Sequence, residues 1–438
     1  MNSLRIAQRC VENLLTPPGA PFGTTGAEAQ DMRFAKPRIR NRANGARESR
    51  LRLGFVPTLE SSPLIAAREL GIFAQRGLEV ELSREVGWAT IREKLLHEEI
   101  DAAVAPAGMA WAIYCGLGAV RRSCLTGLLL GGGGGAITLS RKLRDEGVHD
   151  AESLARVIRS RSGAPSLTFG VPHEYSPQRH SLQKWLQLGG LDPLRDARVT
   201  VIPPGLMYES FRQGYLDGFC GSEPWNRAAI EDGIGWTAAR TSEIDPEQPQ
   251  LALLVLREFA GQREDEHLSL IAALIEAGQF CSLPANRPAL ARLLARAGYF
   301  EVAESLIERA LDGLAGAGPG PAAAEGARGG DILGTSAPTR SAGRRALELV
   351  RALSPREAAR GLRVEAIAKV FRGDLYAAAL ERRLPRAGGP VDPGSPEPTA
   401  AVPRGRAVQP AGLAPAARKS LAATGAACGA PAFAALAF

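Results

Sequence analysis

The sequence has no apolar run approaching the ~20 residues that a membrane helix requires, so we expect no membrane span. Its six cysteines lie far apart, without a CxxC pair or a metal-type cluster, and we interpret them as reduced, mostly buried thiols. HExxH and GxSxG motifs are lacking too. The glycine run Gly131–Gly135 is followed by Ala136 rather than by the lysine of a phosphate-binding loop. We therefore predict no enzymatic activity, no metal and no cofactor.

The net charge of +7 is concentrated at the two ends of the 438-residue chain. Residues 1–50 hold nine Lys or Arg against four acids (+5), and residues 385–438 hold five against two (+3). Residues 51–384 therefore carry 7 − 5 − 3 = −1. Because the central part carries no excess of basic residues, we expect no direct binding of nucleic acid. Low patterning predicts a disordered basic arm at 1–50 and a disordered Ala/Pro/Gly tail at 385–438.

Residues 51–384 alternate between strand-like and helix-like patterns. Leu51–Pro57, Leu78–Leu82 and Ile100–Ala105 are typical of strands, and amphipathic segments such as Trp88–His97 lie between them. The same alternation of strand-like and helix-like segments recurs at 166–221. It predicts an α/β fold with two lobes, and a ligand-binding domain at 51–384.

We place lobe I at about 51–140 together with the C-terminal helices, and lobe II at about 160–250. The chain becomes helical after Leu256, with a flexible, glycine-rich insert at 313–340.

A set of short motifs occurs in a fixed order along this body. They are Gly54–Pro57, Leu82–Thr90, Ala136–Ser140, Trp185–Leu186 with Gly189–Gly190, Pro203–Pro204 with Met207, Asp217–Cys220, Glu223–Asn226 and Arg372–Tyr376. In this order they resemble the nitrate/bicarbonate-binding family of ABC-transporter substrate-binding proteins, which includes cytoplasmic nitrate sensors. The resemblance spans about 51–384. It implies a periplasmic-binding-protein-like fold (type II), with parallel-rich sheets and a helical C-terminal part, that closes by a hinge on a small anion.

The same resemblance implies which residues bind the ligand. They are Trp88, Thr90, Gly135, Gln178, Ser222 and Glu223. Trp88 precedes a predicted helix start, where its indole N–H can donate a hydrogen bond and its ring can form a wall. Glu223 follows a predicted strand end, where it either lines the ligand or has a structural role.

Several positions depart from the family pattern. Gln178 stands where the family has a histidine, and Ser222 stands where it has a glycine. Leu251 occupies the place of the lysine in a Pro-Glu-Lys motif, and Val104 that of a further histidine. Each lost charge-assisted donor weakens the binding of an anion by ~1.5–3 kcal/mol. A nitrate- or nitrite-type anion and a neutral polar ligand therefore both remain open.

The resemblance implies a receptor for small solutes that serves either as an intracellular nitrate sensor or in transport. A sensor would work with an antiterminator-type regulatory protein, and a transport receptor with the membrane subunits of an ABC transporter. Because residues 1–50 contain no apolar signal run, we expect a cytoplasmic location, or a periplasmic one if the start site is misassigned. The alternative is an enzyme of the same fold, such as a thiamine-pyrimidine synthase, but the cysteine cluster of those enzymes is missing.

Overall fold

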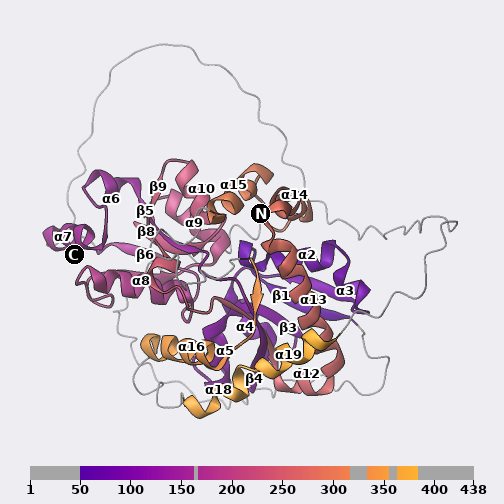
Figure 1. Ribbon diagram of the computed structural model, residues 1–438. Helices are drawn as coiled ribbons and strands as arrows, with labels where there is room; N and C mark the ends of the chain where they lie inside the picture. The colour runs from indigo at the N-terminus through magenta and orange to yellow at the C-terminus, as the bar shows by residue number, and fades with distance from the viewer. Residues whose placement is uncertain (1–49, 162–165, 316–332, 355–362, 383–438) are drawn as a thin grey trace, which may run out of the picture. The chain divides into compact units, whose positions relative to one another are not determined.

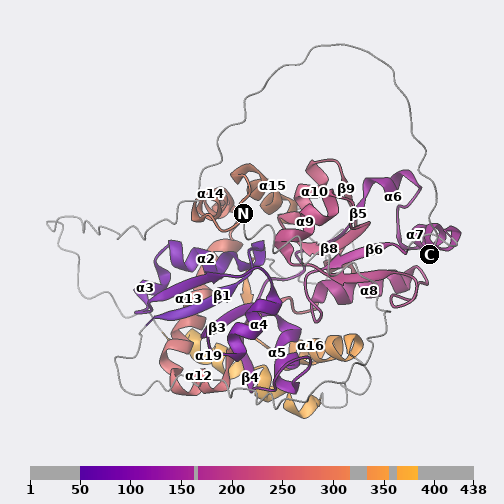
Figure 2. The ribbon, with the colours of Figure 1, turned by 180° about the vertical axis from the view of Figure 1, so that it is seen from behind.

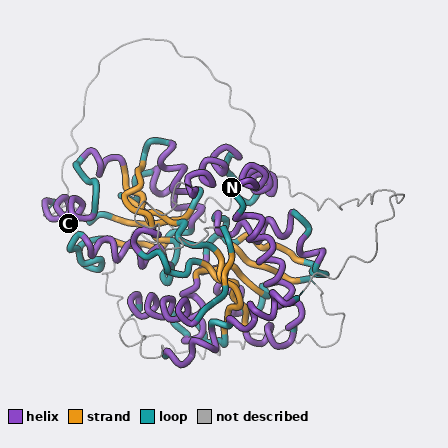
Figure 3. The backbone as a smooth tube through the Cα atoms, viewed as in Figure 1, coloured by secondary structure: helices purple, strands orange, loops and turns teal. Residues whose placement is uncertain are grey.

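The computed structural model describes residues 50–161, 166–315, 333–354 and 363–382 (Figure 1). The predicted arm at 1–49 and the tail from 385 onward lie outside the described residues, as does the part of the insert at 316–332. Two sheets organise the described chain, and Figure 3 shows the strands of each flanked by helices.

The first sheet carries the N-terminal strands, in the order β11-β4-β10-β3-β1-β2. Its strands are β1 (Leu51–Phe55), β2 (Val80–Arg84), β3 (Ala102–Pro106), β4 (Cys124–Leu130), β10 (Leu251–Leu256) and β11 (Thr335–Ser336). Strands β3, β4 and β10 are buried along their whole length, as expected for apolar strands covered on both faces.

Helices from both ends of the described chain cover this sheet. They are α2 (Ser62–Glu69), α3 (Ile72–Gln75), α4 (Trp88–Leu96), α5 (Ala107–Cys115), α12 (Arg257–Gln262), α13 (Glu264–Ser282), α14 (Arg287–Ala297), α15 (Glu304–Ala315), α16 (Arg340–Leu353), α18 (Ile367–Val370) and α19 (Gly373–Glu381). Seen from behind in Figure 2, α13 and α19 lie beside the strands that begin the chain. One continuous apolar core therefore joins β1 to α16 and α19.

The second sheet lies in the middle of the sequence, in the order β7-β6-β8-β5-β9. Its strands are β5 (Gly135–Ser140), β6 (Thr168–Val171), β7 (Arg198–Val201), β8 (Gly218–Ser222) and β9 (Gly235–Arg240). Its helices are α6 (Arg141–Asp145), α7 (Ala151–Ser160), α8 (Pro177–Leu188), α9 (Pro204–Arg212), α10 (Trp225–Glu231) and α11 (Thr241–Ile244). Two smaller apolar clusters form the core of this lobe.

The two-lobed α/β architecture is confirmed, but three details of the prediction are wrong. The sheets are mixed rather than parallel-rich, because β10 pairs antiparallel with β3 and β4, and β5 with β8 and β9. Strand β5, which we placed in lobe I, pairs within the second sheet, so lobe II begins at Gly135. Thr335–Ser336, inside the predicted flexible insert, form β11 and pair with β4.

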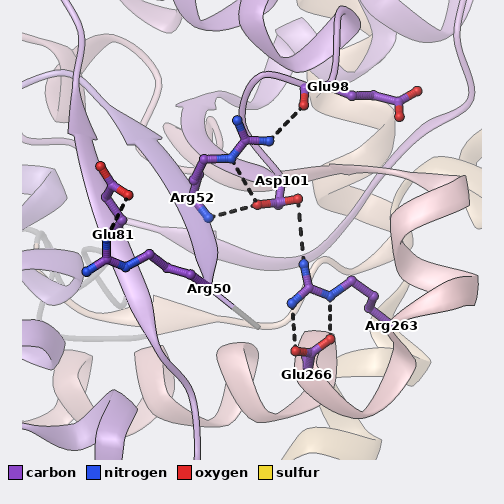
Figure 4. A network of polar contacts seen from close by, with 7 residues as sticks. All are labelled: Arg50, Arg52, Glu81, Glu98, Asp101, Arg263 and Glu266. Atoms are coloured by element: carbon purple, nitrogen blue, oxygen red, sulfur yellow. Dashed lines mark hydrogen bonds and ion pairs between the residues drawn. The ribbon is translucent and has the colours of Figure 1, made fainter. Parts of the chain in front are cut away.

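A network of polar contacts ties the first sheet to α13 at the amino end of β3 (Figure 4). Asp101 Oδ2 accepts from the backbone N–H of Arg52 at 2.8 Å, and Asp101 Oδ1 lies 3.7 Å from the Arg263 guanidinium. Arg263 in turn pairs with Glu266, and the Arg52 guanidinium donates to the Glu98 carbonyl. Because the Arg263 side chain is only 7% exposed, water cannot solvate its positive charge, and the negative charge of Asp101 helps to compensate it.

Replacing Asp101 by asparagine is therefore expected to lower the free energy of unfolding by about 2 kcal/mol. The matched control is Glu81→Gln, since Glu81 pairs with Arg50 at 3.3 Å and both side chains are about half exposed. The control should change stability by less than about 0.5 kcal/mol. Urea unfolding of both variants measures the two values, and equal effects would contradict a stabilising role of the network.

Among the described residues, no single helix has both the length and the apolar composition to cross a membrane. The segments Glu264–Ser282 and Pro284–Ala297 meet those criteria only as a pair, with a bend of 84° between them.

Candidate functional site

Polar side chains gather where the parallel strands of both sheets end. Strand β1 is followed by Thr58–Ser62, β8 ends at Ser222, and β10 begins next to the end of β3. The loops at these edges meet, since the backbone N–H of Leu59 donates to the Glu223 carbonyl at 3.0 Å. Loops at the carboxyl ends of strands are the usual place for ligand sites in open α/β folds.

Glu60 is the most unusual residue of this region. Its side chain is 2% exposed, and no donor of the described residues meets hydrogen-bond geometry with either carboxyl oxygen, although the hydroxyls of Ser222 and Thr58 lie close enough to act on the carboxyl. Burial raises the pKa of Glu60, although its own backbone N–H and the nearby hydroxyls of Ser222 and Thr58 act in the opposite direction. A buried carboxyl without a partner is costly for the fold, so Glu60 is a candidate for contact with a ligand.

Glu223 supplies a second carboxyl beside Glu60. Burial raises the pKa of Glu223 to about 7, and the negative charge of Glu60 raises it further. The backbone N–H of Arg227 donates to Glu223 Oε2 at 3.0 Å. This hydrogen bond and the positive charges of Arg227 and Arg240 lower the pKa of Glu223 and so offset part of the rise. The carboxyl of Glu223 is thus held by the first turn of α10, whereas no helix N–H donates to that of Glu60 among the described residues.

Gln178 is positioned by Ser222. Its amide Nε2 donates to Ser222 Oγ at 3.1 Å, and its side chain is 1% exposed. Among the described residues, Oε1 of the same amide has no partner. Ser222 is also a neighbour of Glu60, so these two predicted site residues lie together with an acid that the sequence had not indicated.

Two further amides lie at the start of β10. Gln250 Nε2 donates to the Gln248 carbonyl at 3.0 Å, and the Gln250 carbonyl accepts from the Ala107 N–H at 3.0 Å. Gln250 Oε1 and Gln248 Nε2 are buried without partners in the described part of the chain. One acceptor and one donor are therefore available at this edge.

Trp88 begins α4, as its sequence context predicts. The two lobes approach each other here, because a Cβ added to Gly87 would lie 3.3 Å from Pro203 Cβ. Trp88 is buried, and within the described ranges its indole N–H has no acceptor. Thr90, by contrast, is exposed in the first turn of α4 and does not join the buried polar residues.

Gly135 opens β5 directly opposite Ser222. A Cβ at this position would lie 3.1 Å from the Gly221 carbonyl, and the Gly135 carbonyl accepts from Thr241 Oγ1 at 3.0 Å. Only a glycine fits this close approach without displacing a neighbour. Gly135 therefore contributes backbone, rather than a side chain, to the edge that carries Ser222.

We call the buried polar residues of these edges the polar cluster. It consists of Thr58, Glu60, Ser62, Trp88, Gln178, Ser222, Glu223, Gln248 and Gln250. Its free groups are mainly oxygen acceptors, and no group of three or more His, Cys, Asp or Glu in the described ranges is arranged to hold a metal ion. Such groups can form hydrogen bonds with a small polar solute.

Five of these residues were missed by the sequence-based prediction. They are Thr58, Glu60, Ser62, Gln248 and Gln250. The first three lie in the loop that follows a buried parallel strand, which could have suggested a site in this loop but not which of its residues are buried. No comparable signal marks Gln248 and Gln250, which precede an antiparallel strand.

A surface groove also lies on the second lobe, away from the polar cluster. It runs along the edge strand β7 and is lined by residues such as Thr168, Arg179 and Arg198. Its lining lacks the buried, unpartnered polar atoms of the cluster, so the cluster is the better candidate for solute binding.

Comparison with known proteins places these features in context. Residues 44–295 match the model of the NMT1-like family. The bicarbonate transport ATP-binding protein CmpC of Synechococcus elongatus is 34% identical over 267 residues, which cover 60% of this chain but 40% of that protein. The nitrate/nitrite binding protein NrtA of the same organism is 28% identical over 304 residues, covering 67% of this chain and 65% of that one. The chain thus spans about two fifths of the length of its CmpC relative.

Solved structures show the same fold. The periplasmic nitrate-binding protein NrtA from Synechocystis has a TM-score of 0.65 at 22% identity, covering 76% of this chain and 88% of that one. The alkanesulfonate-binding protein SsuA from Xanthomonas axonopodis, bound to MOPS, has a TM-score of 0.55 at 16% identity and covers 76% and 99%. The fold is therefore the type II periplasmic-binding-protein fold, built from two mixed sheets with helices.

Proposed function

Because the chain belongs to the NMT1-like family, which matches it over residues 44–295, we propose that it binds a small polar solute at the polar cluster. The relatives reported above are proteins of bicarbonate and nitrate transport, so the chain is a solute-binding domain of the nitrate/bicarbonate-binding kind. Closure of the two lobes around the solute would be its functional motion.

One observation carries this proposal. In the described chain, Glu60, Trp88, Gln178 and Gln250 each bury at least one polar side-chain atom that has no partner. Such atoms are normally satisfied in native proteins, and unsatisfied ones gathered at strand ends are typical of a ligand site. A solute that bonds to them would recover the free energy lost on their burial.

The relatives suggest what to test first. Nitrate, nitrite and bicarbonate are the first candidate ligands, since CmpC and NrtA are named for them. An ABC transporter is the first candidate partner for the same reason. A role as an intracellular nitrate sensor with an antiterminator-type partner is the second reading, and it depends on the same binding event coupled to lobe closure.

Thermal unfolding against a panel of solutes tests the proposal. The panel consists of nitrate, nitrite, bicarbonate, sulfonates, small amides and small amidinium salts at millimolar concentration. A ligand at 100 times its Kd should stabilise the folded state by about 2.7 kcal/mol, which raises the Tm by several degrees. No shift with any member of the panel would contradict solute binding at this site.

Replacing Trp88 by phenylalanine is expected to weaken the solute found in this panel by about 10-fold, because one hydrogen-bond donor is lost and the ring is kept. The matched control is Trp236→Phe, since Trp236 is also buried, its indole N–H is unpartnered within the described chain, and it lies in the core of lobe II. Titration calorimetry measures both affinities. Equal losses in the two variants would show that Trp88 acts through the fold and not on the solute.

A further inference from the structure

The polar cluster offers more acceptors than donors. In the described chain, both carboxyl oxygens of Glu60 and the carbonyl oxygens of Gln178 and Gln250 lack partners. The unpartnered groups that can only donate are the indole N–H of Trp88 and the Gln248 amide, and the hydroxyls of Thr58 and Ser62 can donate or accept. A solute that contacts Glu60 and the Gln178 oxygen must therefore bring N–H or O–H donors of its own.

The charges around Glu60 also favour a solute that donates hydrogen bonds. Glu60 makes no salt bridge with the described residues, and its charge acts on the neighbouring carboxyl of Glu223, whose pKa it raises. The cations of this region, Arg227 and Arg240, act on Glu223 instead. Nitrate carries a negative charge and has no proton to donate, so at a pH where Glu60 is charged it would meet repulsion and two oxygens that it cannot satisfy.

Resting on the solute binding proposed above, we infer that the polar cluster takes a small planar nitrogen cation, of the amidinium or guanidinium class. Such a group donates two parallel N–H bonds to a carboxylate with both oxygens free, as Glu60 has. A further N–H group suits the free amide oxygen of Gln178, which Ser222 links to Glu60. Its charge offsets that of Glu60 and Glu223.

Titration calorimetry of the full chain at pH 8 tests this inference with acetamidinium and methylguanidinium chlorides. Urea serves as the neutral planar probe, sodium nitrate and bicarbonate as the anions, and sodium chloride controls for ionic strength. We expect one of the two cations to bind more tightly than urea and both anions. Its affinity should fall about 100-fold in Glu60→Gln, because two charge-assisted hydrogen bonds are lost.

The matched control is Glu85→Gln. Glu85 is also buried in lobe I, but it is partnered by Lys94 at 2.7 Å and by Ser83 at 2.6 Å. This variant should keep the affinity for the cation within about 3-fold, whereas Glu60→Gln should not.

The pH dependence gives a second, independent readout. Since burial holds the pKa of Glu60 above its usual range, its charged form grows as the pH rises above that range. Affinity for a cation should therefore increase with pH, whereas affinity for nitrate should decrease.

The outcomes separate this inference from the proposed function. Binding of nitrate or bicarbonate alone, strengthened by Glu60→Gln, would overturn the inference and leave solute binding intact. Binding of urea alone, or of a cation whose affinity is unchanged in Glu60→Gln, would overturn it as well. Binding of no solute by the unaltered protein would contradict both the inference and the proposed function.

Discussion

Glu60→Gln is expected to raise the free energy of unfolding of the solute-free protein by about 3 kcal/mol at pH 8. The Glu60 carboxyl is buried, and the nearby hydroxyls of Ser222 and Thr58 offset the loss of water only in part, so its charge is poorly compensated in the folded state and solvated in the unfolded state. Glutamine keeps the shape and removes the charge. The stabilisation would identify Glu60 as a residue retained for function at a cost in stability.

The pH dependence of this effect has a definite sign. Because the pKa of Glu60 is raised on folding, the folded state holds its proton where the unfolded state has lost it. Glu60 therefore weakens the fold increasingly as the pH rises from the usual glutamate value through the raised one. The advantage of the glutamine variant should vanish at pH values below that of an ordinary glutamate.

The same exchange at Glu85 should have the opposite sign. Glu85 is similarly buried but accepts from Lys94 Nζ at 2.7 Å, so Glu85→Gln removes a compensated charge and leaves the lysine without its partner. We expect a loss of about 2 kcal/mol. Urea unfolding of the two variants at pH 8 and pH 4 measures both effects. Destabilisation by Glu60→Gln at pH 8 would show that a protein group compensates its charge after all.

The fold was largely predictable because the residue pattern of each segment and the order of the segments along the chain both indicate an α/β protein. The strands Leu51–Phe55, Val80–Arg84 and Ala102–Pro106 overlap the segments in which the alternation indicated them, and the chain is largely helical after Leu256, as predicted. The pattern could not show that Gly135–Ser140 belongs to the second sheet. An apolar strand is compatible with either sheet, and its partners are 79 to 104 residues away in the sequence.

The site was predictable only in part. Trp88, Gln178 and Ser222 lie among the buried polar residues. They could be predicted because the resemblance to known solute receptors indicates which positions face the ligand. Glu60 could not be singled out, since a glutamate after a strand is usually solvated. Its burial depends on the approach of the loop at Glu223, which is 163 residues away and is held by the Leu59 N–H. Such long-range burial leaves no local trace in a sequence.

Histidine burial predicts that the protein loses stability in mild acid. Burial lowers the pKa of His267 to about 4, helped by the positive charge of Arg372, and lowers that of His173 to about 3 and that of His180 to about 4. The unfolded chain takes up protons on these rings near pH 6.5 while the folded chain does not. Their contribution to stability is therefore complete above pH 6.5 and is lost as the pH falls toward 4. Glu60 and Glu223 act in the opposite direction over part of this range.

His267→Leu isolates one histidine from these opposing groups. His267 is fully buried in α13, beside the ring of Phe259, and neither ring nitrogen has a partner among the described residues. The difference of 2.5 between pKa values of 6.5 and about 4 corresponds to about 3 kcal/mol. Relative to the unaltered protein, the free energy of unfolding of the variant should therefore increase by about 3 kcal/mol between pH 7.5 and pH 4.

The control is His97→Gln, at an exposed position after α4, which should keep the pH dependence of the unaltered protein. Parallel curves of unfolding free energy against pH for His267→Leu and the unaltered protein would mean that the folded state can charge this ring, and that the core around α13 opens to water more readily than its packing indicates.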